Sequence, residues 1–394
     1  MGNRNLAFLT FLVFIAPLSL GQGSAPTLVK AQAAPERPII EVRDGMQSVN
    51  FDMEITSHAV VPLLISSIEV SVFDSGGRLE LRKSINTDAF APSVEVIGPR
   101  LLLPGKTLDV FNPFYEFQPE VMLTEVRYSF CFLQEANEME RDRNRHRLPG
   151  DCDVREELTV RPRTYEGKTS LILPLRGRVF VWEGHDFLAH HLRVPLGQPE
   201  VQELGITANS NEFASDFIFV DEQGKPYHDD PRKLENWYSY GRPIYAPGAG
   251  VVMAAANDIP DNWFKDAKAA GIGHPELAAG KDPKDIGNFV LIDHLDGEYS
   301  LLIHMKPRSV MVKAGDRVES GQAIGAIGFA GDSIFPHLHY ALMDGPEVFK
   351  AWGLPAYFSH FQRIVGGRSV KVDRGPVNSG EFIESDSDSG SRRP

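Results

Sequence analysis

An alternation of apolar and polar residues around one turn most constrains the fold of this chain. Apolar residues alternate with polar ones from Ile68 to Val72 and again from Leu79 to Arg82, on either side of Asp74-Ser75-Gly76-Gly77. Residues two apart on a strand face the same side of a sheet, and a Gly-rich turn between two such runs is typical of a β-hairpin. Further strands are predicted at Val94–Ile97, Thr107–Phe111 and Leu123–Leu133. We therefore expect a mostly β protein that begins with an immunoglobulin-like β-sandwich over residues 38–165.

The length of 394 residues allows two domains at roughly 100–200 residues each. The basic, Pro-containing stretch Arg161-Pro162-Arg163 leads into a second domain, predicted over residues 171–372. The Ser/Asp/Gly-rich residues 378–394 are predicted to be a disordered tail. Lys and Arg number 40 against 53 Asp and Glu, a net charge of −13, and no long basic run is present. These charges argue against a protein that grips nucleic acid or anionic lipid.

The first residues resemble an export signal. Arg4 precedes the apolar run Leu6–Leu20, and small residues follow from Gly21 to Ala25, with a second candidate cleavage signal at Ala31-Gln32-Ala33. We predict a signal peptide within residues 1–33, cleaved between 23 and 33, and export to the periplasm or the cell exterior. An uncleaved anchor is the alternative, but the run is shorter than the ~20 residues that span a bilayer. We expect no transmembrane anchor after cleavage, and no lipid attachment, because no cysteine lies just after the apolar run.

The two cysteines, Cys131 and Cys152, gain meaning in an oxidising compartment. Alternation from Val126 to Phe132 places Cys131 on the strand face opposite the apolar one, where a partly exposed free thiol would be reactive. We predict a disulfide between Cys131 and Cys152 that closes the charged loop around Glu135–Arg147. Two unpaired thiols are the alternative.

A histidine pair gives the first indication of chemistry. Phe335–Leu342 is predicted to be a strand, so His337 and His339 face the same side, opposite Leu338 and Tyr340. Two neighbouring imidazoles suit a metal site, where one binds the ion and the other handles protons. A second predicted strand, Tyr299–His304, ends in another histidine.

Five segments in order now resemble one family. They read YAPGAGVV, GNFVLIDH, LLIHM, VKAGDRVESGQAIGAIG and PHLHYAL. Together they are similar to the lysostaphin-type (LytM-like) zinc metallopeptidases, over about Gly184 to Pro346. The upstream stretch EGHDFLAHH resembles a subgroup in which a His-His pair precedes an Ala-x-Asp-Phe element. The resemblance implies an antiparallel β-sheet domain of duplicated-hybrid-motif fold that binds Zn²⁺ and cuts peptide cross-links of bacterial cell walls.

The resemblance also implies roles for individual residues. Asp216 and His339 match metal ligands, His337 matches the general base, and His304 matches the histidine that steadies the developing oxyanion. Zinc held by about three protein ligands keeps a position for water and lowers the pKa of that water to about 7. His294 is interpreted as a packing or supporting residue, because it alternates with Ile292.

One ligand position departs from the family pattern. The family places a histidine where this chain has Glu212, four positions before Asp216. Three hypotheses follow: His191 or His190 completes the site, Glu212 itself binds the metal, or the site is incomplete. The first two predict a metalloendopeptidase. The third predicts an inactive module that binds cell-wall peptides or activates another hydrolase.

Several other features carry no derived role. His58, His146 and His360 are interpreted as surface residues, and His228 and His274 as solvated loop residues. Two inserts, residues 221–240 and 254–286, are expected to form walls over a substrate groove. The expected partner is a peptide of peptidoglycan, or another peptide substrate. The sequence predicts no oligomeric state.

Overall fold

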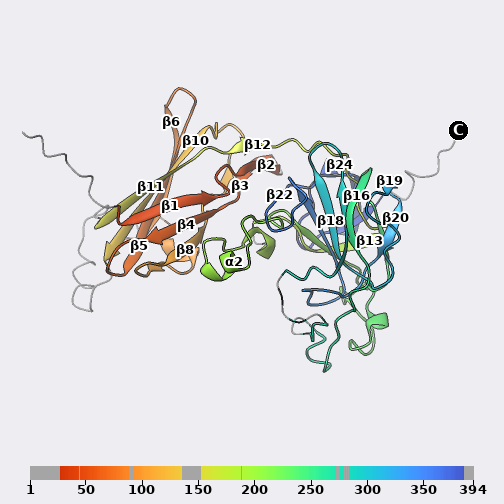
Figure 1. Ribbon diagram of the computed structural model, residues 1–394. Helices are drawn as coiled ribbons and strands as arrows, with labels where there is room; N and C mark the ends of the chain where they lie inside the picture. Colours follow the sequence, from red (N-terminus) through yellow and green to blue (C-terminus); the bar gives the residue numbers. More distant parts are fainter. Residues whose placement is uncertain are drawn as a thin grey trace, which may run out of the picture.

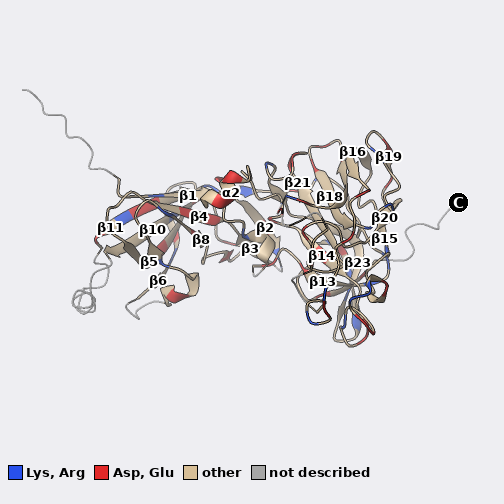
Figure 2. Cartoon of the chain, turned by 60° about the horizontal axis from the view of Figure 1, so that its bottom comes forward, with Lys and Arg blue, Asp and Glu red and all other residues tan. Residues whose placement is uncertain are grey.

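The structure is a computed structural model that describes residues 27–43, 45–87, 92–134, 152–187, 189–271, 275–278, 280, 282 and 284–385. It is mostly β, as predicted, and its strands gather in two parts joined by a short connection (Figure 1). Lys and Arg lie scattered among Asp and Glu over both parts (Figure 2). No helix among the described residues is long and apolar enough to cross a membrane.

The N-terminal part consists of three sheets around one core. Its strand pairs are antiparallel except for β12 and β2, which run parallel. Their strand orders are β1-β4-β8, β11-β10-β5-β6 with β7 on β5, and β12-β2-β3-β9. The elements are β1 (Val29–Ala34), β2 (Ile39–Arg43), β3 (Met46–Val49), β4 (Asp52–Ser57), β5 (Leu63–Phe73), β6 (Leu79–Asn86), η1 (Val94–Ile97), β7 (Leu101–Leu102), β8 (Thr107–Phe111), β9 (Glu116–Phe117), β10 (Glu125–Gln134), β11 (Val154–Val160) and β12 (Arg163–Thr164).

The hairpin predicted from alternation is present. β5 and β6 pair antiparallel from Ser67↔Asn86 to Phe73↔Leu79. The prediction of a strand at Val94–Ile97 is wrong, because these residues form a 3₁₀ helix. The Glu95 N–H donates to the Ser93 hydroxyl, which caps the first turn. Val94 is buried whereas Val96 is exposed, so the segment lacks the one-sided burial of a strand.

The start of β1 bears on the predicted signal peptide. Val29–Ala34 pairs along its whole length with β4. Cleavage after Ala33 would remove nearly all of this strand, so the pairing favours the upstream end of the predicted 23–33 range. Residues 1–26, which include Leu6–Leu20, lie outside the described residues.

The disulfide between Cys131 and Cys152 is present. Cys131 is buried, with 3% of its surface exposed, so the expectation of a partly exposed position was wrong. The pairing of β10 with β5 shifts register between Cys131 and Phe132, and this irregularity breaks the simple alternation. Most of the loop that the bridge closes, residues 135–151, lies outside the described part of the chain.

We expect the double variant Cys131→Ala/Cys152→Ala to unfold with a free energy about 3 kcal/mol lower than the oxidised protein. The bridge joins residues 21 apart, and an unfolded chain without it gains the entropy of an open loop. Urea unfolding measures the difference, with the reduced wild-type protein as control. A loss below about 0.5 kcal/mol, the range of ordinary surface changes, would contradict a stabilising role.

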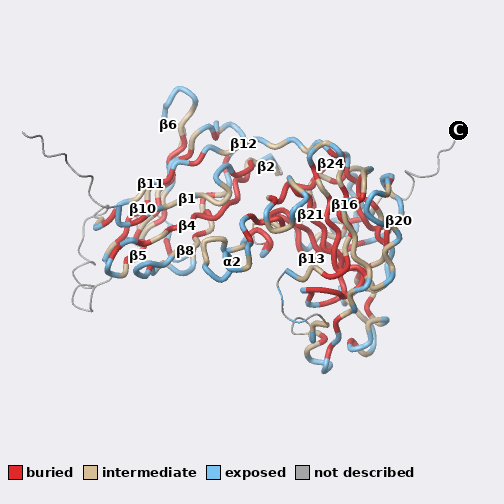
Figure 3. Tube along the Cα trace, in the orientation of Figure 1, coloured by how far each residue is buried: buried red, intermediate tan, exposed pale blue. Residues whose placement is uncertain are grey.

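The second part is built on one large sheet with the order β19-β16-β17-β18-β21-β14-β13-β25-β23-β24, and β22 on β21. Its central strands, β17, β18, β21 and β14, are largely buried, whereas the edge strand β24 is largely exposed (Figure 3). The elements are β13 (Arg178–Glu183), η2 (His190–Leu192), α2 (Pro199–Glu203), β14 (Ser215–Ile218), η3 (Leu234–Asn236), β15 (Pro243–Tyr245), β16 (Gly250–Ala256), β17 (Asn288–Asp293), β18 (Tyr299–Met305), β19 (Arg317–Val318), β20 (Ala323–Ala326), β21 (Leu338–Met343), β22 (Gly353–Leu354), β23 (Phe358–Val365), β24 (Arg368–Gly375) and β25 (Phe382–Ser385).

The predicted disordered tail, residues 378–394, is partly wrong. β25 pairs with both β13 and β23 inside the large sheet. Ile383 is fully buried, and the Phe382 ring packs on Phe180. These two apolar residues and the free edges of β13 and β23 explain why the segment folds despite its polar composition. Residues 386–394 lie outside the described residues.

The two inserts pack beside the sheet. Trp237 from the first insert stacks on Phe264 from the second and on Phe335, in an apolar cluster separate from the main core. The second insert begins later than expected, because Ala254–Ala256 still belong to β16. His274 lies outside the described residues.

Candidate metal centre

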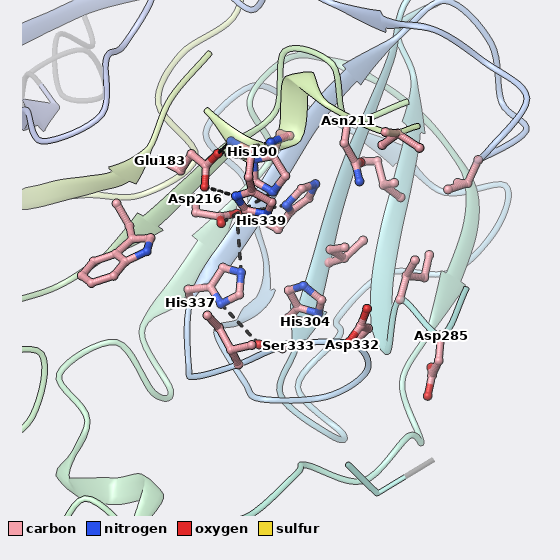
Figure 4. Close-up of a pocket in the computed structure, with 18 of the residues that line it drawn as sticks. Glu183, His190, Asn211, Asp216, Asp285, His304, Asp332, Ser333, His337 and His339 are labelled. Atoms are coloured by element: carbon pink, nitrogen blue, oxygen red, sulfur yellow. Dashed lines mark hydrogen bonds and ion pairs between the residues drawn. The ribbon is translucent and has the colours of Figure 1, made fainter. Parts of the chain in front are cut away.

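A cavity of about 400 Å³ lies on one face of the large sheet, beside the ends of β13, β14, β18 and β21. Asp216, His339 and His190 gather at one end of it, and His337 and His304 lie next to each other further along (Figure 4). Asp216, His304, His337 and His339 are all at least 95% buried. The structure thus brings together the ligand, base and oxyanion residues that the sequence predicted.

Strand register explains this convergence. Asp216 on β14 lies opposite His339 on β21 and opposite Glu183 on β13. β21 begins at Leu338 rather than at Phe335, so His337 precedes the strand. The alternation predicted for this segment nevertheless holds, because Leu338 and Tyr340 point into the apolar core.

Three side chains meet closely enough to hold one ion. One ligand atom from each of His191, Asp216 and His339 lies within 4.8 Å of the others. His191 Nε2 is 3.7 Å from Asp216 Oδ2, and His339 Nδ1 is 3.0 Å from Asp216 Oδ1. Burial alone would raise the pKa of Asp216, but the surrounding histidines hold that pKa well below its ordinary value. Asp216 is therefore an anion at neutral pH.

The two candidate upstream histidines differ sharply in position. The His190 side chain is 73% exposed and contacts Glu183, whereas the His191 side chain is 8% exposed and faces Asp216. Burial, only partly offset by Asp216, lowers the pKa of His191 to about 3. A neutral imidazole is the form that binds a metal, so the geometry favours His191 over His190.

Glu212 is placed elsewhere. It is buried, with 4% of its surface exposed. Two groups of described residues lie close enough to hold an ion, His191-Asp216-His339 and Glu183-His190-His191, and Glu212 belongs to neither. Burial raises its pKa well above the ordinary value, and the nearby carboxylate of Asp52 raises it further. This arrangement does not support Glu212 as a ligand.

The protons on His337 and His304 can be assigned from their partners. His337 Nδ1 lies 2.8 Å from the Phe335 carbonyl, and His304 Nδ1 lies 2.9 Å from the Ala330 carbonyl. A carbonyl only accepts, so both Nδ1 atoms carry hydrogen and both Nε2 atoms are free to accept. His337 Nε2 is 3.5 Å from Asp216 Oδ1, beside the predicted ligands.

The two rings differ in proton affinity. Burial lowers the pKa of His337, but the Asp216 charge outweighs it, so that the pKa is raised overall. Burial lowers the pKa of His304 well below its ordinary value, and His337 and His339 lower it further. His304 is thus neutral and offers an acceptor at Nε2, whereas the predicted oxyanion role needs a second proton on that ring.

His304 also has an unusual backbone conformation. Its φ of 61° lies in the left-handed region, which costs of order 1 kcal/mol or more for a residue with a Cβ. The Nδ1 contact with Ala330 and a 3.0 Å bond from the Gly328 N–H to the His304 carbonyl hold it there. Such strain is concentrated at functional sites.

Sequence reasoning missed Glu183. Its carboxylate accepts the backbone N–H of His190 and, at 3.2 Å, that of His191, so it orients η2. The residue opens the EGHDFLAHH stretch, and its place directly before the Gly184-His185 pair of that stretch was the available signal. His294 packs as predicted: its Nε2 lies 2.7 Å from Ser300 Oγ, and its Nδ1 2.8 Å from the Ala249 carbonyl.

Residues 237–350 match the family model described as Peptidase family M23. His304, His337 and His339 fall inside this span, whereas Asp216 and His191 precede it. Peptidoglycan DD-endopeptidase ShyC of Vibrio cholerae is 40% identical over 103 residues, which are 26% of this chain and 18% of ShyC. ShyA of the same organism, also a peptidoglycan DD-endopeptidase, is 31% identical over 103 residues, with the same shares. The match thus spans less than a fifth of either relative.

Solved structures were compared as well. The catalytic domain of lysostaphin from Staphylococcus simulans is 17% identical, over 45% of this chain and 86% of that chain, with a TM-score of 0.23. A putative peptidase M23 from Pseudomonas aeruginosa is 14% identical, over 70% of this chain and 82% of that chain, with a TM-score of 0.25.

Proposed function

We propose that this chain, which carries a Peptidase family M23 domain over residues 237–350, is an exported zinc-dependent endopeptidase that hydrolyses peptide bonds of bacterial peptidoglycan. The observation that carries the proposal is the meeting of His191, Asp216 and His339 beside His337 and His304 in one buried cleft. The peptidoglycan endopeptidases ShyC and ShyA support the substrate class.

The donor set fits zinc. Two imidazoles and one carboxylate are ligands of catalytic zinc, and three protein ligands leave a position for water. His339 Nε2 is buried without a hydrogen-bond partner, and His191 Nε2 lies 3.7 Å from Asp216 Oδ2, so each ring keeps a nitrogen that can bind a metal. When bound, zinc supplies Lewis acidity that activates water near neutral pH and polarises a carbonyl.

The residues of the chain handle the proton and the substrate. With Nδ1–H fixed on the Phe335 carbonyl, His337 accepts a proton at Nε2, the atom beside the cluster. His304 holds its Nε2 lone pair towards the same cleft, and its ring centroid lies 4.8 Å from that of His337. In this proposal His304 orients the attacking water as an acceptor, and donates to the substrate oxygen only once it has gained a proton.

The second candidate function is an inactive module that binds cell-wall peptides or activates another hydrolase. Glu212 at the family's histidine position is the observation in its favour. It requires a site that binds zinc weakly or does not cleave, despite His191 beside Asp216.

The two candidates are separated by metal removal. We expect the purified chain to bind about one zinc per molecule and to cleave peptidoglycan peptides, to lose cleavage when a chelator strips the metal, and to regain it with added zinc. Inductively coupled plasma mass spectrometry and chromatography of the peptides measure both. Cleavage by metal-free protein would contradict the proposal, and zinc-loaded protein without cleavage would favour the inactive module.

A further inference from the structure

A second cavity, of about 690 Å³, lies between the two parts of the molecule. Its N-terminal wall comes from β4, β8 and the loops around them, and its other wall from the segment between β13 and α2, which lies between the parts (Figure 1). Its charged and aromatic lining residues are Asp52, Asp109, Phe111, Tyr115, Phe187 and Arg193.

Two carboxylates in this cavity lack a full set of hydrogen-bond or ion-pair partners among the described residues. Asp52 is 9% exposed, and no described residue donates a hydrogen bond to its carboxylate or forms an ion pair with it. Asp109 Oδ2 accepts from Gln198, but Asp109 Oδ1 is buried without a partner. Burial raises the pKa of Asp52 to about 7, and Asp109 raises it too, whereas Arg193 lowers it. An unpaired carboxylate at this depth is costly, and a cationic group of a ligand would relieve that cost.

Arg193 is the one cationic side chain among the described lining residues, and its contacts are with aromatic and backbone groups rather than with the two carboxylates. The Arg193 guanidinium lies over the Phe111 ring, 4.1 Å from its centroid, and donates to the Phe187 carbonyl at 3.2 Å. Among described residues it forms no ion pair with Asp52 or Asp109. With a pKa of about 7, Asp52 is about half protonated at neutral pH, and a cation bound beside it would hold it as the anion.

The residues that line the cavity indicate which kind of cation would bind there. Phe187 stacks on Tyr115 with 3.7 Å between centroids, and Phe111 lies 4.9 Å from Phe187. Aromatic rings and a resident guanidinium do not suit a divalent metal, which needs six or more oxygen ligands. A primary ammonium has three donors for carboxylate oxygens and is attracted to aromatic faces.

The cavity is connected to the candidate active site. Arg193 lines both cavities, and it directly follows η2, which carries His191. Arg193 thus forms part of the wall of both cavities, which places the second cavity beside the first.

We propose that this interdomain cavity is a substrate subsite that receives a primary ammonium group, such as the side-chain amine of a diamino acid, of the peptide being cleaved. This inference rests on the proposed function. The amine is then the feature of the peptide that the N-terminal part recognises.

The test compares two peptides that differ only in the free or acetylated state of one side-chain amine. We expect wild-type protein to prefer the free amine by about tenfold or more in kcat/KM, mainly through KM, because a charged hydrogen bond to a buried partner is lost on acetylation. In Asp52→Asn this preference falls to about one. The matched control Glu120→Gln, on an exposed loop of the same part, keeps the preference.

Further measurements test whether the Asp52→Asn variant misfolds and whether the cavity binds a free amine instead of the substrate. Asp52→Asn removes an unpaired buried charge, so its Tm at pH 8 should not fall below that of wild type. Equilibrium binding of the two peptides to His337→Ala measures the same preference without turnover. Failure of the subsite can then be told from failure of the proposed activity. Equal treatment of the two peptides by wild type, or an undiminished preference in Asp52→Asn, would overturn the inference. Equal inhibition of both reactions by free alkylamine, with no peptide preference, would place a free amine rather than the substrate there and also overturn it.

Discussion

Replacement of His337 by alanine is expected to lower the rate of peptide hydrolysis by about 10²–10⁴-fold, the range for loss of a general base. The Phe335 carbonyl fixes the proton of His337 on Nδ1, so Nε2 is left as the accepting atom, 3.5 Å from Asp216 Oδ1. His304 lacks this combination, since its pKa is lowered. The pKa of His190 is also raised, but that ring is 73% exposed and its Nδ1 contacts Glu183 rather than Asp216.

Zinc content and Tm should change little in the His337→Ala variant, because His191, Asp216 and His339 are untouched. The matched control is His58→Ala, an exposed histidine of the N-terminal part, which should retain the wild-type rate. Initial rates on a defined peptidoglycan peptide measure the effect. Wild-type turnover by His337→Ala would show that another group takes the proton, whereas loss of zinc along with activity would make His337 a ligand.

Replacement of His191 by alanine is expected to weaken zinc binding more than about 100-fold, beyond the 10–100-fold loss typical of a group that only supports a ligand. Activity at limiting zinc should fall with it. His191 points at Asp216 with its side chain almost fully buried, and one of its ring nitrogens has no hydrogen-bond partner.

The adjacent His190→Ala variant provides the control. The His190 ring is 73% exposed and turned to Glu183, so zinc affinity should stay within about tenfold of wild type, the lower bound for lost support of a ligand. Equilibrium titration against a competing chelator measures both constants. The reverse order of effects, or a large effect of Glu212→Gln alone, would assign the third ligand differently.

The choice between His190 and His191 shows what the sequence could not predict. Both histidines lie in one short 3₁₀ helix, and a rotation of that helix would exchange them. Its orientation depends on Glu183, seven and eight residues earlier, whose carboxylate accepts both backbone N–H groups. A contact of this kind is set by tertiary packing and leaves no periodic pattern.

Strands with clear alternation were predicted well. The β5–β6 hairpin and the common face of His337 and His339 follow from the two-residue period alone. β25 escaped prediction because the composition of its neighbourhood is polar and only Phe382 and Ile383 can be buried. Propensity at Val94–Ile97 favoured a strand, but the Ser93 side chain caps the segment and its residues form a helical turn.

The interdomain cavity was also beyond prediction from the sequence. Asp52 and Asp109 lie on neighbouring strands β4 and β8, but Arg193 reaches them from the other part of the chain. Only the placement of the two parts shows that the two carboxylates and Arg193 line one cavity. The role expected for the inserts, as walls over a substrate groove, stays a prediction.

The central claim is that His191, Asp216 and His339 form one zinc site, and anomalous diffraction at the zinc edge from zinc-loaded crystals tests it most directly. We expect a single strong peak at about 2.0–2.2 Å from a nitrogen of His191, a nitrogen of His339 and an oxygen of Asp216. A peak bound instead by Glu183 and His190, a peak at Glu212, or no peak at all would contradict it.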